Sequence, residues 1–230
     1  MAYMKWVMAL ILSGIAWAQG GRVALPVIDI LYPDPNGSIL DGACGGLLKT
    51  TVKPERVQEA VRRVPELQAL WDQEGAEYLK TTFQEIGLTF PYREMQATLT
   101  VCPGVVTMSS PLLFSVKQYL PSSAVRLPDE HFVEQLYHEL MHHYVRQARD
   151  ASALRKKYET EGQRTLSHLH VVSLEKFVLT QMGKAEELKR VETDYLNSPN
   201  PGYPRAWKIV SEEGYEPFLN ELKQYARSRN

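Results

Sequence analysis

The sequence predicts a mostly helical α+β fold, in which one small β-sheet packs on a central helix and further helices follow. Two observations support this. Apolar residues recur at helical spacing over most of the chain after residue 54, whereas residues 95–101 alternate between apolar and polar side chains as a half-buried strand does. With 44% hydrophobic and 23% charged residues, the chain has the composition of a globular protein with a substantial core.

The N-terminal segment has the order of a secretory signal peptide over residues 1–18. A single Lys5 precedes a short apolar run, which ends in the small-x-small cleavage site Ala16-Trp17-Ala18. The run is shorter than the roughly 20 residues that a membrane-spanning helix needs. We therefore expect cleavage after Ala18 and a secreted or periplasmic protein. The alternative is a buried N-terminal helix or an uncleaved anchor.

The segment after the signal is rich in glycine, proline and aspartate over residues 19–53, which predicts an extended, turn-rich lead-in. A helical pattern starts at Pro54. A second helix is expected to begin at Pro65, because proline suits the first turn of a helix, and to end near Glu85 with Gly87 as its C-cap. Residues 19–94 are therefore expected to form the lead-in and the first helices.

The middle of the chain changes period, which predicts a small sheet over residues 95–116. Strands are expected at residues 95–101, 105–108 and 111–116, separated by turn residues. The sheet thus directly precedes the second helical part of the chain.

Residues 128–230 are expected to form the remaining helices. The first runs over about residues 128–147, and its acidic first turn suits the positive end of the helix dipole. A second runs over about residues 165–182 and ends at Gly183. A turn-forming stretch, residues 197–204, then precedes a last helical pair.

The cysteines and the net charge limit the environment and the partners. Cys44 and Cys102 are the two cysteines of the chain, and in an oxidising compartment such a pair is expected to form a disulfide. The formal net charge of −1 gives no electrostatic reason to expect nucleic acid or an anionic membrane as a partner. No apolar run after residue 20 is long enough to cross a membrane, and we expect a monomer.

The sequence HELMH, residues 138–142, lies within the helix expected at 128–147. Histidines at positions i and i+4 lie on one face of a helix, so the imidazoles of His138 and His142 can bind one metal ion. All six histidines of the chain fall between residues 131 and 170, and such clustering is expected of a metal site. The alternative is that both are ordinary half-buried helix residues.

Glu139 follows the first histidine and is expected to act on water rather than on the metal. Zinc with three protein ligands keeps a fourth position for water and lowers the pKa of that water to about 7. Glu139 can then take a proton as the water attacks a carbonyl group, and later deliver it to the leaving amine. A purely structural zinc site would be closed by four protein ligands and would not need an acid here.

With these residues the chain resembles the zincin superfamily of zinc metallopeptidases, over the motif helix and the helix after it. The resemblance implies a zinc ion, hydrolysis of peptide bonds, and one zincin-like catalytic domain over residues 19–230, with the motif helix packed under a small sheet. The metzincin branch needs glycine and histidine where this sequence has Val145 and Ala148. The third ligand is therefore expected from a separate downstream helix, as in the thermolysin-like and aminopeptidase-like branch.

Three residues are candidates for the third ligand, and His168, in the first turn of the next expected helix, is ranked first. Glu161 is second, because its distance from His142 and the glycine after it resemble zinc aminopeptidases, although the following residues depart from that pattern. Glu175 is third. It shares a helix face with His168 and is either the ligand or a partner of the ligand. Each could instead be an ordinary solvated or hydrogen-bonded residue.

The remaining histidines are given minor roles. His143 points away from the side that faces the metal and is expected at the surface or beside the site. His131 lies two turns before His138 on the same face and is expected at the rim of a cleft. His170 lies on the other side of its helix from His168, so the two are not expected to bind one ion together.

We expect a secreted or periplasmic zinc peptidase that acts on peptide or protein substrates, with Tyr203 or Arg205 as a donor to the oxyanion. Tyr203 could instead pack at a helix start. One alternative keeps the zinc chemistry but hydrolyses a non-protein amide. The others are a non-catalytic secreted helical binding protein and a metal-carrying protein. The cleavage preference, and the choice between endopeptidase and exopeptidase, stay open.

Overall fold

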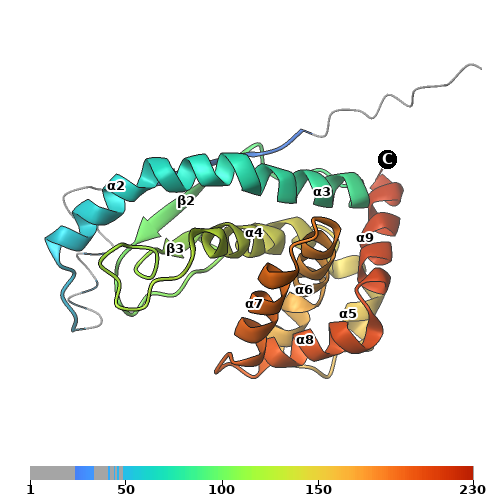
Figure 1. Ribbon diagram of the computed structural model, residues 1–230. Coiled ribbons are helices and arrows are strands. Elements are labelled where there is room, and N and C mark those ends of the chain that lie inside the picture. Colours follow the sequence, from blue (N-terminus) through green and yellow to red (C-terminus); the bar gives the residue numbers. More distant parts are fainter. Residues whose placement is uncertain (1–23, 34–40, 42–43, 45, 47–48, 230) are drawn as a thin grey trace, which may run out of the picture.

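The computed structural model describes residues 24–33, 41, 44, 46 and 49–229. The expected signal peptide and its cleavage site after Ala18 lie outside these residues. Within them the chain is a mostly helical α+β protein with a small sheet, as the sequence predicts (Figure 1). None of the helices in the described ranges combines the length and the apolar character that a bilayer span requires.

The sheet consists of three parallel strands in the spatial order β1 (Val27–Leu31), β2 (Glu94–Thr100) and β3 (Leu113–Ser115). β1 lies in the segment of residues 19–53, for which an extended, turn-rich lead-in was predicted but no strand of the sheet. Its residues Ile28 and Ile30 are buried, and Gln68 of the first long helix binds the backbone of both along the free edge of the strand. This strand is too short for the alternation of its side chains to stand out in the sequence.

The expected strand at residues 105–108 forms a loop instead. Met108 and Leu113 exchange two backbone hydrogen bonds, 2.9 and 3.0 Å long, as an isolated bridge. Only Leu113–Ser115 then joins the sheet, beside β2. The loop between β2 and β3 therefore stays outside the sheet, and its residues are available to line a cleft.

The two parallel strands β1 and β2 are joined by a helical crossover, which parallel pairing requires. It contains α2 (Pro54–Leu70), a π-helical turn η1 (Trp71–Gly75) and α3 (Ala76–Ile86). Pro65 lies inside α2 and does not open a second helix, because Val57 and Leu67 on either side of it bury one continuous face. Gly87 ends α3 in the left-handed conformation, with a φ of 76°.

The C-terminal part contains α4 (Asp129–Arg146), a short 3-10 turn η2 (Arg149–Ala151), α5 (Ala153–Lys157), α6 (Gln163–Gln181), α7 (Ala185–Leu196), α8 (Gly202–Glu213) and α9 (Glu216–Arg229). α4 packs on the sheet, where the ring centroids of Phe132 and Phe114 are 4.5 Å apart. α2 and α3 run above α4, and α6 to α9 gather at one end of it (Figure 1). The sequence did not predict α7, which buries only Val191 and Tyr195.

Cys44 and Cys102 form the predicted disulfide, with a Cα–Cα distance of 5.9 Å. The bridge ties the segment before α2 to the end of β2, across 58 positions of sequence. In the chain-entropy model a loop of this length stabilises the fold by about 4 kcal/mol. Such a bridge persists in oxidising compartments.

Glu221 of α9 connects α9 to α5 and α6. Its carboxylate accepts hydrogen bonds from the Ser152 hydroxyl (2.6 Å), the Leu154 N–H (2.9 Å) and Nε2 of His170 (2.7 Å). Burial alone would raise the pKa of Glu221, but these hydrogen bonds outweigh it and lower the pKa to about 2. Folding therefore favours the ionised carboxylate.

Replacing Glu221 by glutamine is expected to lower the free energy of unfolding by about 3 kcal/mol at pH 7. Because the folded pKa lies below the ordinary value of 4.5, this contribution is complete above that value and is lost as the pH falls toward 2. Urea unfolding at pH 7 and pH 3 should therefore show a smaller difference at pH 3. The exposed Glu159→Gln is the control. If Glu221→Gln lowered the free energy of unfolding by the same amount at pH 7 and at pH 3, the ionised carboxylate would not have this role.

Candidate metal centre

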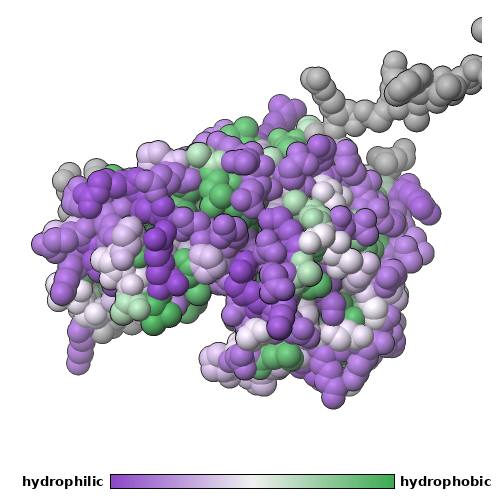
Figure 2. All heavy atoms as spheres, viewed as in Figure 1, coloured by the Kyte–Doolittle hydropathy of each residue, from purple (hydrophilic) through white to green (hydrophobic). Residues whose placement is uncertain are grey.

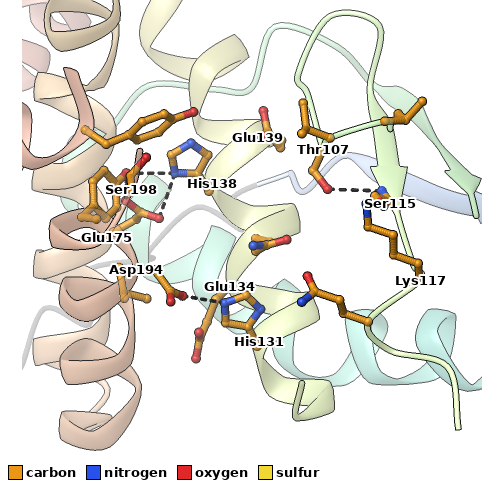
Figure 3. A pocket seen from close by; sticks show the side chains of 17 residues that line it. Thr107, Ser115, Lys117, His131, Glu134, His138, Glu139, Glu175, Asp194 and Ser198 are labelled. Atoms are coloured by element: carbon orange, nitrogen blue, oxygen red, sulfur yellow. Dashed lines mark hydrogen bonds and ion pairs between the residues drawn. The ribbon is translucent and has the colours of Figure 1, made fainter. Parts of the chain in front are cut away.

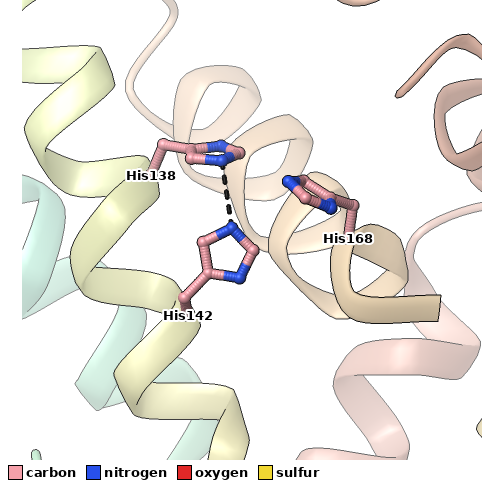
Figure 4. A group of neighbouring side chains, drawn as sticks. All are labelled: His138, His142 and His168. Carbon is pink, nitrogen blue, oxygen red and sulfur yellow. Dashed lines mark hydrogen bonds between the residues drawn. The ribbon is translucent and has the colours of Figure 1, made fainter. Parts of the chain in front are cut away.

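His138 and His142 of α4 and His168 of α6 direct their imidazole rings toward one another (Figure 4). One nitrogen of each ring lies within 4.8 Å of the others, as in a site that could hold a metal ion. The Nε2 atoms of His138 and His142 are 3.2 Å apart, and the ring centroids of His142 and His168 are 4.5 Å apart. The packing of α6 beside α4 thus adds a third histidine to the pair that helical spacing provides.

Hydrogen bonds determine which ring nitrogen of His138 and His168 faces the others. Nδ1–H of His138 donates to Oε1 of Glu175 (3.0 Å), and Nδ1–H of His168 donates to the carbonyl oxygen of Arg164 (2.7 Å). A neutral imidazole with a proton on Nδ1 presents a lone pair at Nε2. The Nε2 atom of His168 is buried, and among the described residues it has no hydrogen-bond partner. A buried acceptor of this kind is costly unless a cation binds it.

The distance between the first two nitrogens also suits a metal ion. Two lone pairs that face each other repel unless a proton or a cation lies between them. In a tetrahedral zinc site with Zn–N bonds of about 2.0–2.1 Å, two ligand nitrogens are about 3.3 Å apart. The Nε2 atoms of His138 and His142 are 3.2 Å apart. Because imidazole also suits copper, iron and nickel, the three residues form a candidate centre for a transition metal.

Burial keeps two of the three rings neutral. It lowers the pKa of His142, and together with the neighbouring His138 it lowers the pKa of His168 to about 3. For His138, burial alone would lower the pKa, but the Glu175 carboxylate outweighs burial and raises it. His142 and His168 therefore offer lone pairs at neutral pH.

The other two candidates for the third ligand have different partners. Glu161 accepts hydrogen bonds from Arg205, at 2.9 Å from Nε and 2.5 Å from the terminal nitrogen. Glu175 accepts from the Tyr195 hydroxyl (2.7 Å) with its second oxygen and so orients His138 from behind. Tyr195 was not predicted at this site, because it lies on α7, which the sequence did not reveal.

Two hollows meet at Glu139, the residue expected to act on water. One has a volume of about 340 Å³ and the other about 370 Å³, and both are lined by Val106, Thr107, Glu139 and Tyr203. In Figure 3, α4 lies between the β2–β3 loop with Thr107 and the helices α6 and α7, which carry Glu175 and Asp194. Figure 2 shows the surface hollowed between this loop region and α7 and α8. The candidate centre therefore opens to an elongated cleft.

Tyr203 combines the two roles that the sequence left open. It packs in the first turn of α8, where its ring centroid is 4.5 Å from that of His168, and it also lines both hollows. Arg205, the other oxyanion candidate, is bound to Glu161 and lines a separate surface hollow beside Trp207. Arg205 is therefore not among the residues that line the two hollows at Glu139.

The remaining histidines lie around the candidate centre. His131 lines the first hollow and is hydrogen-bonded with Tyr119 (2.7 Å) and Asp194 (2.8 Å), which agrees with a place on the cleft rim. His143 is buried rather than at the surface, and its Nε2 donates to the carbonyl oxygen of Ser109 (2.6 Å). This bond fixes the β2–β3 loop to α4 beside Glu139.

Comparisons with protein-family models, with curated proteins and with solved structures found no match for this chain. The geometry of the site and the chemistry of its residues therefore indicate what the protein can do.

Proposed function

We propose that the protein is a zinc-dependent peptidase that acts outside the cytoplasm, with zinc held by His138, His142 and His168. The observation that carries the proposal is that the three histidines lie beside a cleft formed by two hollows, and that Glu139 lines both hollows. A zinc ion bound by three imidazoles supplies Lewis-acid chemistry, since it polarises a carbonyl group and lowers the pKa of water. A simple carrier site would need neither the carboxylate nor the cleft.

Glu139 supplies the proton transfer. Burial raises the pKa of its carboxyl group above the ordinary value. A carboxylate whose pKa is shifted toward neutrality takes a proton from water and returns it to a leaving amine more readily than an ordinary one. Glu139 lies between the two hollows. A peptide that extends through both hollows would therefore place the bond to be cleaved next to its carboxyl group.

Tyr203 is the proposed donor to the oxyanion. Its side chain lines both hollows, and burial raises its pKa, which keeps the hydroxyl protonated. A donor preorganised at the point where negative charge develops stabilises the transition state of acyl transfer. A non-protein amide could be hydrolysed by the same three groups, and it is the second candidate substrate.

Action outside the cytoplasm is supported by the Cys44–Cys102 disulfide and by the signal-like N-terminal sequence. Analysis of the N-terminus of the exported protein would test the expected cleavage after Ala18.

The protein purified without chelators is expected to contain about one zinc ion per chain by elemental analysis and to cleave members of a mixed peptide library. Treatment with 1,10-phenanthroline should remove the zinc and the hydrolysis together, and one equivalent of zinc should restore both. A zinc-loaded protein that cleaves no peptide would refute the peptidase. A protein that binds no transition metal would refute the site itself.

A further inference from the structure

We infer that the second hollow of the cleft is a binding site for a carboxylate group of the substrate, built from four arginines. The inference rests on the proposed function, because it describes which peptides that cleft would take. Its evidence is the charge, the pairing and the position of the side chains around the two hollows.

The charged side chains that line the two hollows are of opposite kinds, with mostly carboxylates in the first and arginines in the second. The second is lined by arginines from four successive elements, and the one carboxylate among its lining residues is Glu139. These arginines are Arg146 of α4, Arg149 of η2, Arg155 of α5 and Arg164 of α6. The first hollow is lined by four carboxylates and a single lysine. They are Glu134, Glu139, Glu175, Asp194 and Lys117. The cleft is therefore polarised along its length, with Glu139 at the boundary.

The arginines of the second hollow are largely unneutralised. Arg149 is paired with Asp150, and Arg155 donates a hydrogen bond to the uncharged Gln163. Among the described residues, no carboxylate lies within ion-pair distance of Arg146 or Arg164. A bound anion would supply the missing negative charge, and guanidinium groups bind carboxylates through paired hydrogen bonds.

Arg164 connects this charge to the candidate metal centre. Its guanidinium lies over the Tyr203 ring, 5.6 Å from the ring centroid, and its carbonyl oxygen holds His168. A Cβ atom at Gly202 would lie 2.6 Å from the Arg164 side chain, so glycine lets the start of α8 approach it closely. A carboxylate in this hollow would therefore lie close to the bond that is cleaved.

Two sources could present the carboxylate. The C-terminal carboxylate of a peptide would make the protein an exopeptidase that removes C-terminal residues. An aspartate or glutamate side chain would make it an endopeptidase with a preference for acidic residues on one side of the bond. Both place the same chemical group among the same arginines, and one set of peptides distinguishes them.

The test measures the binding of three fluorescently labelled peptides of one parent sequence to the Glu139→Gln variant, which is expected not to cleave them. The first peptide ends in a free carboxylate, the second in an amide, and the third in an amide with an internal glutamate. At least one acidic peptide is expected to bind about tenfold more tightly than the neutral one. This preference should weaken as salt is added.

Arg146→Glu in the same background should abolish the preference, because Arg146 is exposed, lines the hollow and has no ion pair with another described residue to lose. Arg164→Met, which keeps the apolar stem beside Gly202, should reduce it. Arg62→Gln, at an exposed arginine on α2, is the control and should preserve it. Thermal melting of each variant establishes that it is folded.

Tighter binding of only the peptide with the free C-terminus would identify an exopeptidase. Tighter binding of the peptide with the internal glutamate would identify an endopeptidase. Equal binding of all three peptides, or a preference that survives both Arg146→Glu and Arg164→Met, would overturn the carboxylate site. Because the measurement is of binding, it is independent of hydrolysis. A protein that prefers acidic peptides but cleaves none would retain the carboxylate site and lose the peptidase.

Discussion

Replacing Glu139 by glutamine is expected to lower kcat for peptide hydrolysis by about 10²–10⁴-fold while the bound zinc is retained. The side chain belongs to the cleft and not to the group of three histidines. An amide has nearly the same size as a carboxylate but cannot accept the proton of an attacking water molecule. The loss should therefore fall on kcat rather than on KM, and steady-state kinetics with elemental analysis of the same sample would show it.

Glu130→Gln is the matched control for this variant. Glu130 is an exposed glutamate in the first turn of the same helix and does not line either hollow. It should leave both kcat and zinc content unchanged. Hydrolysis at the wild-type rate in the Glu139→Gln protein would remove Glu139 from the mechanism, whereas loss of zinc would show that it supports the metal.

The pair of histidines on α4 could be predicted from sequence because it depends only on helix geometry. Residues i and i+4 face the same side of any α-helix, so His138 and His142 converge wherever the helix packs. The span of α6 was also predicted closely, as residues 165–182 against the observed Gln163–Gln181.

The third member of the group could not be fixed in this way. Whether His168, Glu161 or Glu175 meets the pair depends on the angle and register at which α6 crosses α4, which no local pattern encodes. Tyr195 was missed for a related reason. α7 was not assigned, although Leu188, Val191 and Tyr195 recur at helical spacing, and the position of Tyr195 beside His138 depends on how α7 packs on α6.

The arginine-lined hollow was not predicted from the sequence. The four arginines of the second hollow are spread over residues 146–164 among two lysines, three carboxylates and uncharged residues, and the chain as a whole has a net charge of −1. A whole-chain charge cannot show a local imbalance that arises when several short elements turn their side chains toward one space. The proposed carboxylate site therefore could be inferred only from the three-dimensional structure.

Replacing His168 by alanine is expected to abolish tight zinc binding. His168 is fully buried, and its unpartnered Nε2 is the atom that a metal would engage. Two imidazoles alone do not complete the set of three protein ligands that catalytic zinc sites use. The affinity should fall by more than the 10–100-fold that loss of an outer hydrogen-bonding partner typically causes. Zinc should accordingly raise the melting temperature of the wild-type protein and not that of the variant.

Two further variants make the result specific to the metal. His170→Gln removes another buried histidine of α6, one that binds Glu221, and should lower stability while zinc still raises the melting temperature. Glu161→Gln should leave zinc binding unchanged, because Glu161 is bound to Arg205. The zinc affinity of each variant can be measured by competition with a chromophoric chelator. If His168→Ala had the wild-type affinity and Glu161→Gln a reduced affinity, α6 would not complete the site. The acidic ligand that the sequence ranked second would then hold the metal.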